Sequence, residues 1–556
     1  MKELHFPHWP KGLPKTIAIP EQNLSETLRV SAQKNPNKAA IVYYDSVITY
    51  KQLEAEVIKV SGYFEQVLGV QKGDRVLLYM QNSPQFVIAY YAILRIQAIV
   101  VPLNPMNVPE ELAFFVEDSE ASVAVVGQEL VSNIVPFLQT TSLQHIIVAT
   151  YSDYLPENTP YTLSEIITSQ RQTISHEHIT HWNEVICSTH KPSYLSFEPG
   201  TVAVLPYTSG TTGNPKGCIH THETTLANVL GAAYWTHLTD DAVILATLPF
   251  FHVTGMQHGM NAPLYVGATI VIVTRWDRDI AAKLIETYKV THWINISTMV
   301  VDFLQVSNLT SYDFSSLSIV GGGGAPLPKT IGETLLQVLG VSYIEGYGLS
   351  ETMAQTHFNP VHRPKLQCMG VPSFGVDARV WDPNTQQLLG VGEEGEVIVA
   401  GPQVCKGYWK RQEATEEAFI TLNGTTYFRT GDIAKVDEEG YYFIVDRLKR
   451  MINVSGFKVW PTEIEAILYK HPSILQACVI GVQDERSVEA VKAFVIRKPN
   501  ETITEDEIIA WSRKVMANYK IPRTVAFVEE LPLSGTGKIL WRLLQEQEKK
   551  KKEELA

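Results

Sequence analysis

Cysteine is scarce in this chain, and its scarcity excludes two kinds of structure. Five of the 556 residues are cysteines, namely Cys187, Cys218, Cys368, Cys405 and Cys478. Their number is odd and no two of them form a C-x-x-C pair, so the sequence predicts neither a zinc ribbon nor a disulfide framework. Reduced thiols in a long chain favour a cytoplasmic protein.

A long uninterrupted apolar run is also missing. The first fourteen residues, MKELHFPHWPKGLP, contain prolines and charges in place of the apolar stretch that a signal peptide requires. The most apolar window, Phe86 to Leu103, is barely long enough to span a bilayer and contains Arg95 and Gln97. We expect a buried helix there that leads into a buried strand.

Basic residues are outnumbered by acidic ones. Lys and Arg total 46 against 59 Asp and Glu, which gives a formal net charge of -13. A surface with this excess repels phosphate backbones, so nucleic acid is excluded as the expected partner. The 45% of apolar residues can build a large core, and the length corresponds to about three to five domains or subdomains.

Helical and strand-like stretches alternate through most of the chain. Short apolar runs at 75–79, 98–103 and 122–126 lie between stretches with helical spacing at 54–68 and 109–117. This alternation is typical of α/β architecture with mostly parallel sheets.

The pattern changes after residue 375. Strand patterns follow one another directly at 375–382, 387–401 and 441–446, which indicates a more antiparallel, barrel-like subdomain. From Pro461 onward helix and strand alternate again in a unit of about a hundred residues, the usual size of one domain. We therefore expect a short boundary near Asp446 to Ile452, between an N-terminal part that ends in the barrel-like subdomain and a small unit of helices and strands.

The most informative segment is YTSGTTGNPKG, from Tyr207 to Gly217, directly after an apolar strand at 201–205. Its glycines let backbone N–H groups approach an anion, its hydroxyls add donors, and its lysine adds a positive charge. The spacing differs from the Walker motif, because Lys216 follows Gly210 by six residues and is followed by glycine. The segment predicts a phosphate-binding loop that contains Thr208, Ser209, Gly210, Thr211, Thr212, Gly213 and Lys216.

This loop resembles the signature of the adenylate-forming superfamily, which includes acyl-CoA synthetases, luciferases and peptide-synthetase adenylation domains. Further segments resemble the remaining motifs of that superfamily in the expected order across nearly the whole chain. They are PFFH (249–252), GGGGAP (321–326), EGYGLSE (345–351), YFRTGD (427–432), DRLK (446–449) with VSGF (454–457), and PLSGTGK (532–538). The string MINVSGFKVWPTEIE is similar to bacterial fatty-acid–CoA ligases. Luciferases and coumarate ligases tend to have lysine where Asn453 stands, so the asparagine weakens the resemblance to those two groups.

The resemblance implies a role for each matching residue. It implies catalytic roles for Lys538, Lys216, Glu351 and His252, and a hinge at Lys449. The hinge implies an N-terminal domain at 1–448, with two α/β subdomains and a small β-barrel-like one, and a mobile α+β domain at 449–556. Mg²⁺ would be bound by Glu351 and Thr211, coenzyme A by Ser455, Gly456 and Phe457, and the acyl chain by His252, Met256, Gly322 and Gly323. Besides the loop residues, ATP or AMP would contact Gly323, Gly324, Ala325, Pro326, Glu345, Gly346, Tyr347, Gly348, Ser350, Asp432, Arg447 and Lys538.

The residue types suit these tasks. A ring between glycines, as at Tyr347, can stack on a flat base. Ser350 replaces the threonine that is more common in the family but keeps the hydroxyl for the α-phosphate. The Lys538 ammonium suits the point where two anions meet. The run KILW, which begins at Lys538, predicts a strand.

Three further patterns carry no function in our interpretation. Gly390 to Gly395 matches G-x-G-x-x-G, but a strand follows where a dinucleotide-binding helix would begin. The histidines of HEHITH at 176–181 lack zinc-site spacing and predict an exposed polar loop. The lysines of the tail, 549–552, predict a solvated helix end.

The sequence thus predicts an ATP-dependent acid–CoA ligase of the cytoplasm, which acts on a medium- or long-chain fatty acid. An aryl-acid or other carboxylic-acid–CoA ligase, or a stand-alone enzyme that loads a carrier protein, is the alternative. The expected partners are the acid, ATP and coenzyme A, with Mg²⁺ as cofactor. An apolar substrate leaves a peripheral membrane contact open, and the sequence does not indicate an oligomeric state.

Overall fold

A computed structural model describes residues 4–208, 215–324, 326–454, 457–484, 488–499, 501–533 and 539–555. The chain forms two compact units. The large unit comprises His5–Asp377 and Val399–Phe428, and the small unit comprises Met1–Leu4, Ala378–Ile398 and Arg429–Ala556. The predicted boundary between residues 448 and 449 is the point about which the C-terminal domain would rotate. It stays a prediction.

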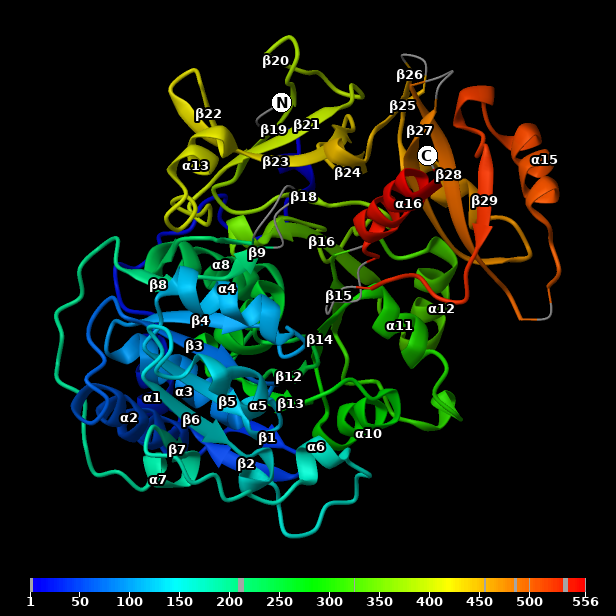
Figure 1. Cartoon of the computed structure of the whole chain (residues 1–556). Helices are drawn as coiled ribbons and strands as arrows, with labels where there is room; N and C mark the ends of the chain where they lie inside the picture. The colour runs from blue at the N-terminus through cyan, green and yellow to red at the C-terminus, as the bar shows by residue number, and fades with distance from the viewer. Residues whose placement is uncertain are drawn as a thin grey trace. The chain divides into compact units, whose positions relative to one another are not determined.

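A nine-stranded sheet forms one half of the large unit, in the order β18-β17-β16-β15-β14-β12-β13-β1-β2 (Figure 1). The central pairs from β16 to β1 are parallel, and the pairs at both ends are antiparallel. The strands are β1 (Ala39–Tyr43), β2 (Ser46–Thr49), β12 (Val243–Ala246), β13 (Thr269–Ile272), β14 (His292–Asn295), β15 (Ile319–Gly322), β16 (Tyr343–Leu349), β17 (Ala354–Phe358) and β18 (Val371–Pro372).

A seven-stranded sheet forms the other half, in the order β11-β8-β4-β3-β5-β6-β7. All neighbours are parallel except β11 and β8. The strands are β3 (Arg75–Tyr79), β4 (Ile99–Leu103), β5 (Val123–Gly127), β6 (His145–Ala149), β7 (Ile179–His181), β8 (Val202–Val204) and β11 (His220–Thr221).

Both faces of the seven-stranded sheet are buried, as the apolar runs predict. Along β3, Val76 and Leu78 belong to the core that continues into the nine-stranded sheet, whereas Leu77 and Tyr79 belong to a second core. Successive side chains of a strand point to opposite faces, so a strand buried on both sides has no polar alternation.

Helices cover these cores. The first core includes buried residues of α1 (Ser25–Lys34), α2 (Tyr50–Gln66), α3 (Pro84–Arg95) and α8 (His222–Trp235), and the second includes those of α4 (Pro109–Ser119). All residues of α3 except Arg95 are buried, and its N-terminus is capped by the Ser83 hydroxyl, which accepts from the Phe86 N–H at 3.2 Å. The apolar window is thus a buried core helix followed by β4, as predicted.

Four further helices of the large unit alternate along the chain with strands of the nine-stranded sheet. They are α9 (Ala262–Val266), α10 (Arg278–Tyr288), α11 (Ser297–Phe303) and α12 (Lys329–Leu339). Asp277 caps α10 through its side chain, which accepts from the N–H groups of Asp279 and Ile280. Such caps satisfy backbone donors that a helix start leaves without an intrahelical partner.

The predicted small β subdomain is a six-stranded sheet in the order β20-β19-β21-β23-β22, with β24 beside β23. Its strands are β19 (Asp377–Asp382), β20 (Gln387–Leu388), β21 (Gly395–Ala400), β22 (Phe419–Leu422), β23 (Thr425–Val436) and β24 (Tyr442–Arg447). β21 begins at Gly395, so the G-x-G-x-x-G match leads into a strand, as expected.

The C-terminal part of the small unit is a five-stranded sheet, β26-β25-β28-β27 with β29 beside β28. Its strands are β25 (Ile452–Val454), β26 (Phe457–Val459), β27 (Ile474–Asp484), β28 (Val488–Arg497) and β29 (Thr524–Phe527). On one face β27 packs with α14 (Pro461–Leu468) and α15 (Glu505–Val515), and on the other with α16 (Trp541–Leu555). The sheet therefore has a core on each side.

Two local predictions were wrong. HEHITH is not only a loop, because Ile179–His181 form β7, where Ile179 is buried against the neighbouring core. KILW is not a strand, because Ile539 makes one bridge to Leu533 and helix α16 begins at Trp541. Within the described ranges, no helix combines the length and apolarity needed to cross a membrane.

Candidate active site

The ends of the predicted phosphate-binding loop are joined by a short antiparallel pair in the large unit. Strand β9 (Tyr207–Thr208) pairs with β10 (Lys216–Gly217), so that Thr208 lies opposite Lys216. Ser209, Gly210, Thr211, Thr212 and Gly213 lie outside the described residues. The hairpin places the two ends of the loop next to each other, as a cradle around an anion requires.

Ser350 and Glu351 belong to the 3-10 turn η7 (Ser350–Thr352), whose backbone is held from three directions. His220 Nε2 donates to the Ser350 carbonyl at 2.7 Å, and the Cys405 N–H donates to the Glu351 carbonyl at 2.8 Å. Asn228 Nδ2 donates to the carbonyls of the next two residues, both at 2.7 Å. Four consecutive carbonyls, those of residues 350–353, are thus bound by other segments.

The backbone after this turn is strained. Met353 and Ala354 have φ angles of 49° and 89°, in the left-handed region that favours glycine. Such conformations cost on the order of 1–3 kcal/mol each and persist only where the surroundings determine them. A Cβ at Gly348 would collide with the Ala354 backbone, so glycine is required there. The hydrogen bonds to residues 350–353 supply that support, and strain of this kind is often found at functional sites.

The Glu351 carboxylate accepts a hydrogen bond from the Tyr408 hydroxyl, at 2.9 Å to Oε1. Lys216 Nζ lies 5.1 Å from the centroid of the Tyr408 ring. Tyr408 was not among the residues predicted from the sequence. Its neighbours pair with the strand that contains Lys216, through bonds from Trp409 N to Gly217 O at 2.8 Å and from Ile219 N to Gly407 O at 2.9 Å.

The donor set around Glu351 fits Mg²⁺. Mg²⁺ prefers oxygen ligands and is bound in nucleotide enzymes through one or two carboxylates together with substrate phosphates. Glu351 is the described member of the predicted pair, and Thr211 lies outside the described residues. In the part of the chain that the structure describes, no group of three or more His, Cys, Asp or Glu residues could hold a metal ion. The histidines at 176–181 therefore form no such group.

Glu345 is buried at the start of the EGYGLSE motif, in β16. Its Oε1 accepts from the Gln367 N–H at 2.8 Å, and burial raises the pKa of this carboxyl to about 7. Two residues on, the Tyr347 ring meets the His357 ring edge-on, with centroids 5.7 Å apart. Glu345 thus ties the backbone at Gln367 to the strand that contains Gly346, Tyr347 and Gly348.

The glycines at and just after the end of β15 lie against backbone. A Cβ at Gly322 would collide with the Asn295 carbonyl, and one at Gly323 would lie 2.5 Å from the Gly346 carbonyl. Gly324 has a φ of 88°, and Ala325 lies outside the described residues. Close packing therefore requires glycine at 322 and 323, whether or not an acyl chain passes them, and the predicted contacts of Gly323, Gly324 and Pro326 with nucleotide stay predictions.

His252 lies in the turn before a π-helix, η5 (Gly255–Asn261), a type that often marks functional sites. Its Nδ1 accepts from the Thr254 N–H at 3.3 Å, and its carbonyl accepts from the Met256 N–H at 2.9 Å. Met256 is fully buried in the core. A Cβ at Gly255 would collide with the Pro249 carbonyl, so this glycine fixes the turn.

In the small unit, Asp432 and Arg447 are partners. They lie opposite each other on β23 and β24, and Arg447 Nε is 3.0 Å from Asp432 Oδ1. Asp432 is almost fully buried, whereas Arg447 is 46% exposed. The structure brings the predicted ribose-binding pair together.

The predicted hinge residue Lys449 lies in the 3-10 turn η8 (Leu448–Arg450). On either side of it, Asp446 Oδ2 accepts from the Thr462 N–H at 2.7 Å, and Arg450 donates to Glu465 Oε1 at 2.5 Å. Both bonds lead to α14, so rotation at Lys449 has to break the first of them. Phe457 begins β26, while Ser455, Gly456 and Lys538 lie outside the described residues.

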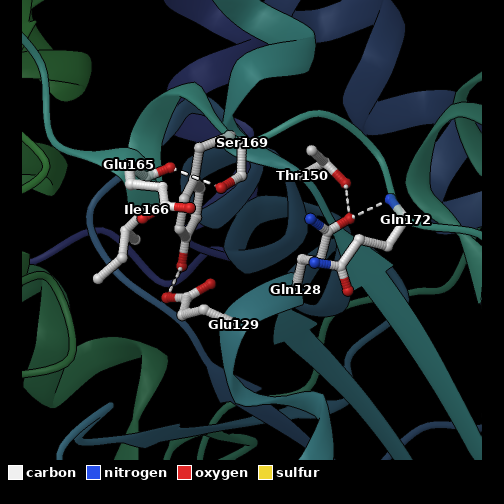
Figure 2. A pocket seen from close by; sticks show the side chains of 8 residues that line it. Gln128, Glu129, Thr150, Glu165, Ile166, Ser169 and Gln172 are labelled. Carbon is white, nitrogen blue, oxygen red and sulfur yellow. Dashed lines mark hydrogen bonds between the residues drawn. The ribbon is translucent and has the colours of Figure 1, made fainter.

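A separate cavity of about 140 Å³ is lined by residues that follow β5 in the sequence (Figure 2). Its polar groups bind one another, because Gln128 Oε1 accepts from the Thr150 hydroxyl and the Gln172 N–H, and Glu129 Oε1 accepts from the Tyr151 hydroxyl. None of the predicted site residues lines this cavity, so we place the candidate site at Lys216 and Glu351 instead.

Because the chain buries neutral histidines, its free energy of unfolding is expected to decrease as the pH falls. Burial lowers the pKa of His220 to about 4, below the 6.5 of an exposed histidine, so the unfolded chain takes up the proton first as the pH falls. His220 thus lowers the free energy of unfolding from pH 6.5 down to about 4, by up to about 1.4 kcal/mol per pH unit. His220→Asn is expected to reduce this slope in urea unfolding at pH 7.5 and 5.0. An unchanged slope would contradict the neutral state of His220.

Comparisons with known proteins identify similar chains and folds. Models described as AMP-binding enzyme and AMP-binding enzyme C-terminal domain match residues 28–409 and 463–538. A long-chain-fatty-acid–CoA ligase of Bacillus subtilis is 34% identical over 97% of both chains. Among solved structures, ATP-bound MatB from Rhodopseudomonas palustris is 27% identical with a TM-score of 0.83, covering 94% of this chain and 98% of that one. The anthranilate CoA ligase AuaEII, in complex with anthranoyl-AMP, is 27% identical with a TM-score of 0.80 over 96% and 98%.

Proposed function

Because the chain belongs to the AMP-binding enzyme family, we propose that it is an ATP-dependent acid–CoA ligase. It would convert a carboxylic acid and ATP to acyl-AMP and pyrophosphate, and then acyl-AMP and coenzyme A to acyl-CoA and AMP. The observation that carries this proposal is the similarity to a long-chain-fatty-acid–CoA ligase along the whole chain.

In the first half-reaction a carboxylate oxygen bonds to the α-phosphorus while the bond to pyrophosphate breaks. Two anions have to meet, so positive charge at the point of contact lowers the barrier. Lys216 and Lys538 would supply it, with the N–H groups and hydroxyls of the loop and Ser350 as further donors. Mg²⁺, bound through Glu351 and Thr211, would supply charge neutralisation on the phosphates.

The motifs assign separate contacts to the base and the ribose of the nucleoside. Tyr347 would stack on the base, because a ring between glycines leaves the base close to the backbone. The Asp432 carboxylate would accept from the ribose hydroxyls, and the exposed Arg447 would donate from its fixed place beside it.

In the second half-reaction the thiolate of coenzyme A attacks the acyl carbon, and AMP leaves with the electrons of the broken carbon–oxygen bond. We propose that rotation at Lys449 withdraws Lys538 and presents Ser455, Gly456 and Phe457 to coenzyme A. The Asp446 bond to Thr462 would belong to one of the two poses.

The acid would be a medium- or long-chain fatty acid bound near His252, Met256, Gly322 and Gly323. A flexible, polarisable methionine suits an apolar lining. An aryl acid is the second candidate, because the anthranilate CoA ligase has the same fold over nearly the whole chain. A carrier protein in place of coenzyme A is the third. We also propose a cytoplasmic location, which the free cysteines support.

A panel of acids tests this proposal. We expect ATP–pyrophosphate exchange with saturated acids between about C8 and C18 and much less with acetate, since each buried methylene adds about 0.8 kcal/mol of binding. The panel should include benzoate, anthranilate and ferulate, and holo-carrier protein should be compared with coenzyme A as acceptor. Faster exchange with an aryl acid than with any fatty acid would overturn the fatty-acyl assignment.

A further inference from the structure

We propose that Tyr408 is a positioning residue for adenylation, which aims the Glu351 carboxylate at bound Mg²⁺ and holds Lys216 beside it. The proposal rests on the proposed function, because Glu351 and Lys216 serve ATP only if the chain is an adenylating enzyme. One side chain contacts both charges: its hydroxyl donates to Glu351 Oε1 at 2.9 Å, and its ring centroid lies 5.1 Å from Lys216 Nζ.

The backbone delivers Tyr408 to this place without help from the hydroxyl. Tyr408 forms a bridge with Cys218, flanked by the bonds from Trp409 to Gly217 and from Ile219 to Gly407. Its N–H donates to the Thr415 hydroxyl at 2.9 Å. Gly407, with a φ of 135°, would bring a Cβ to 2.6 Å from Thr415, so glycine permits this approach.

The same segment also holds the backbone of Glu351. The Cys405 N–H donates to the Glu351 carbonyl. Tyr408, three residues later in the chain, donates to the Glu351 carboxylate. Main chain and side chain of Glu351 are therefore fixed by one segment, 405–408. Removing the hydroxyl alone leaves the backbone bonds in place, so its loss is expected to change the direction of the carboxylate without unfolding the turn.

The two contacts differ in what they stabilise. A hydrogen bond from a neutral donor to an ionised carboxylate is stronger than one between neutral groups and sets the direction of the carboxylate. A lysine over the face of a tyrosine ring is attracted by the ring itself and needs no hydroxyl. Tyr408→Phe therefore removes the first contact and keeps the second, whereas Tyr408→Leu removes both.

Calorimetric titration of ATP into the enzyme, with no acid or coenzyme A present, tests the proposal. For Tyr408→Phe we expect affinity for ATP in Mg²⁺ to fall about 10-fold or more, because the carboxylate that binds the metal loses a charge-assisted hydrogen bond that orients it. Affinity for ATP in EDTA should stay at the wild-type value. For Tyr408→Leu we expect affinity to fall in EDTA as well.

Two controls separate positioning from a structural role. Tyr161→Phe removes another phenol–carboxylate bond, to Asp45, outside the site, and should leave the ratio of the two affinities unchanged. In pyrophosphate exchange, Tyr408→Phe should need more Mg²⁺ for half-maximal rate while its kcat at saturating Mg²⁺ approaches that of the wild type. Equal losses with Mg²⁺ and with EDTA, or no loss in Mg²⁺, would overturn the proposal. Failure of every acid in the exchange panel would overturn the proposed function but leave the calorimetric result standing.

Discussion

Lys538→Ala is expected to slow acyl-AMP formation by about 10²–10³-fold, the usual cost of removing one group that stabilises charge in a transition state. The ammonium is needed only while carboxylate and α-phosphate meet. Thioester formation from supplied acyl-AMP should therefore continue near the wild-type rate. The two half-reactions are measured separately, as pyrophosphate release with acid and ATP, and as acyl-CoA formation from synthetic acyl-AMP.

The split between the half-reactions decides the role of Lys538. Lys549→Ala, which removes an exposed lysine of α16, should change neither rate and serves as the matched control. Equal losses in both half-reactions would show that Lys538 supports the structure of the small unit and has no selective part in adenylation.

Glu351→Gln is expected to reduce pyrophosphate exchange by about 10²-fold or more, because an amide in place of a carboxylate is a poor ligand for a hard cation and removes its charge. The amide oxygen can still accept the hydrogen bond from Tyr408, so the turn should keep its structure. Exchange rates over a range of Mg²⁺ concentrations measure the effect.

A lost metal contact and a lost fold have different signatures here. The variant should melt near the wild-type temperature, as should the control Glu333→Gln, whose side chain is 57% exposed. If Glu351→Gln exchanged pyrophosphate at the wild-type rate at the same Mg²⁺ concentration, the assignment of Glu351 as a metal ligand would be contradicted.

Local pattern predicted most of the elements. The apolar run at 75–79 coincides with β3, and the window after Phe86 is the buried helix α3 followed by β4. These segments have one environment along their length, so composition and period are sufficient. KILW misled because three apolar residues after a lysine cannot distinguish a strand from the first turn of a helix.

The contacts of the site were harder to predict than its members. The motifs named Glu351 and Lys216, yet the residue between them, Tyr408, comes from a segment 57 residues after the first and pairs with a strand near the second. His220 and Asn228 were missed for the same reason, since their bonds to residues 350–353 cross more than a hundred positions. No periodicity in the sequence records which loops meet in space.

The glycines at 322 and 323 allow two interpretations. The run after Val320 predicts room for an acyl chain, and in the structure a Cβ at Gly322 would collide with the carbonyl of Asn295 and one at Gly323 with that of Gly346. Small residues permit close backbone approach as well as an open space, and the sequence cannot tell the two apart.

The oxygen of the acid tests the central claim most directly. Octanoate or palmitate labelled with ¹⁸O in both carboxylate oxygens should be incubated with the enzyme, ATP and coenzyme A, and the nucleotide product analysed by mass spectrometry. If acyl-AMP forms, one labelled oxygen stays on phosphorus when the thiol displaces AMP, so each AMP should carry one ¹⁸O and pyrophosphate none. Unlabelled AMP, or label in inorganic phosphate with ADP as the nucleotide product, would contradict the account.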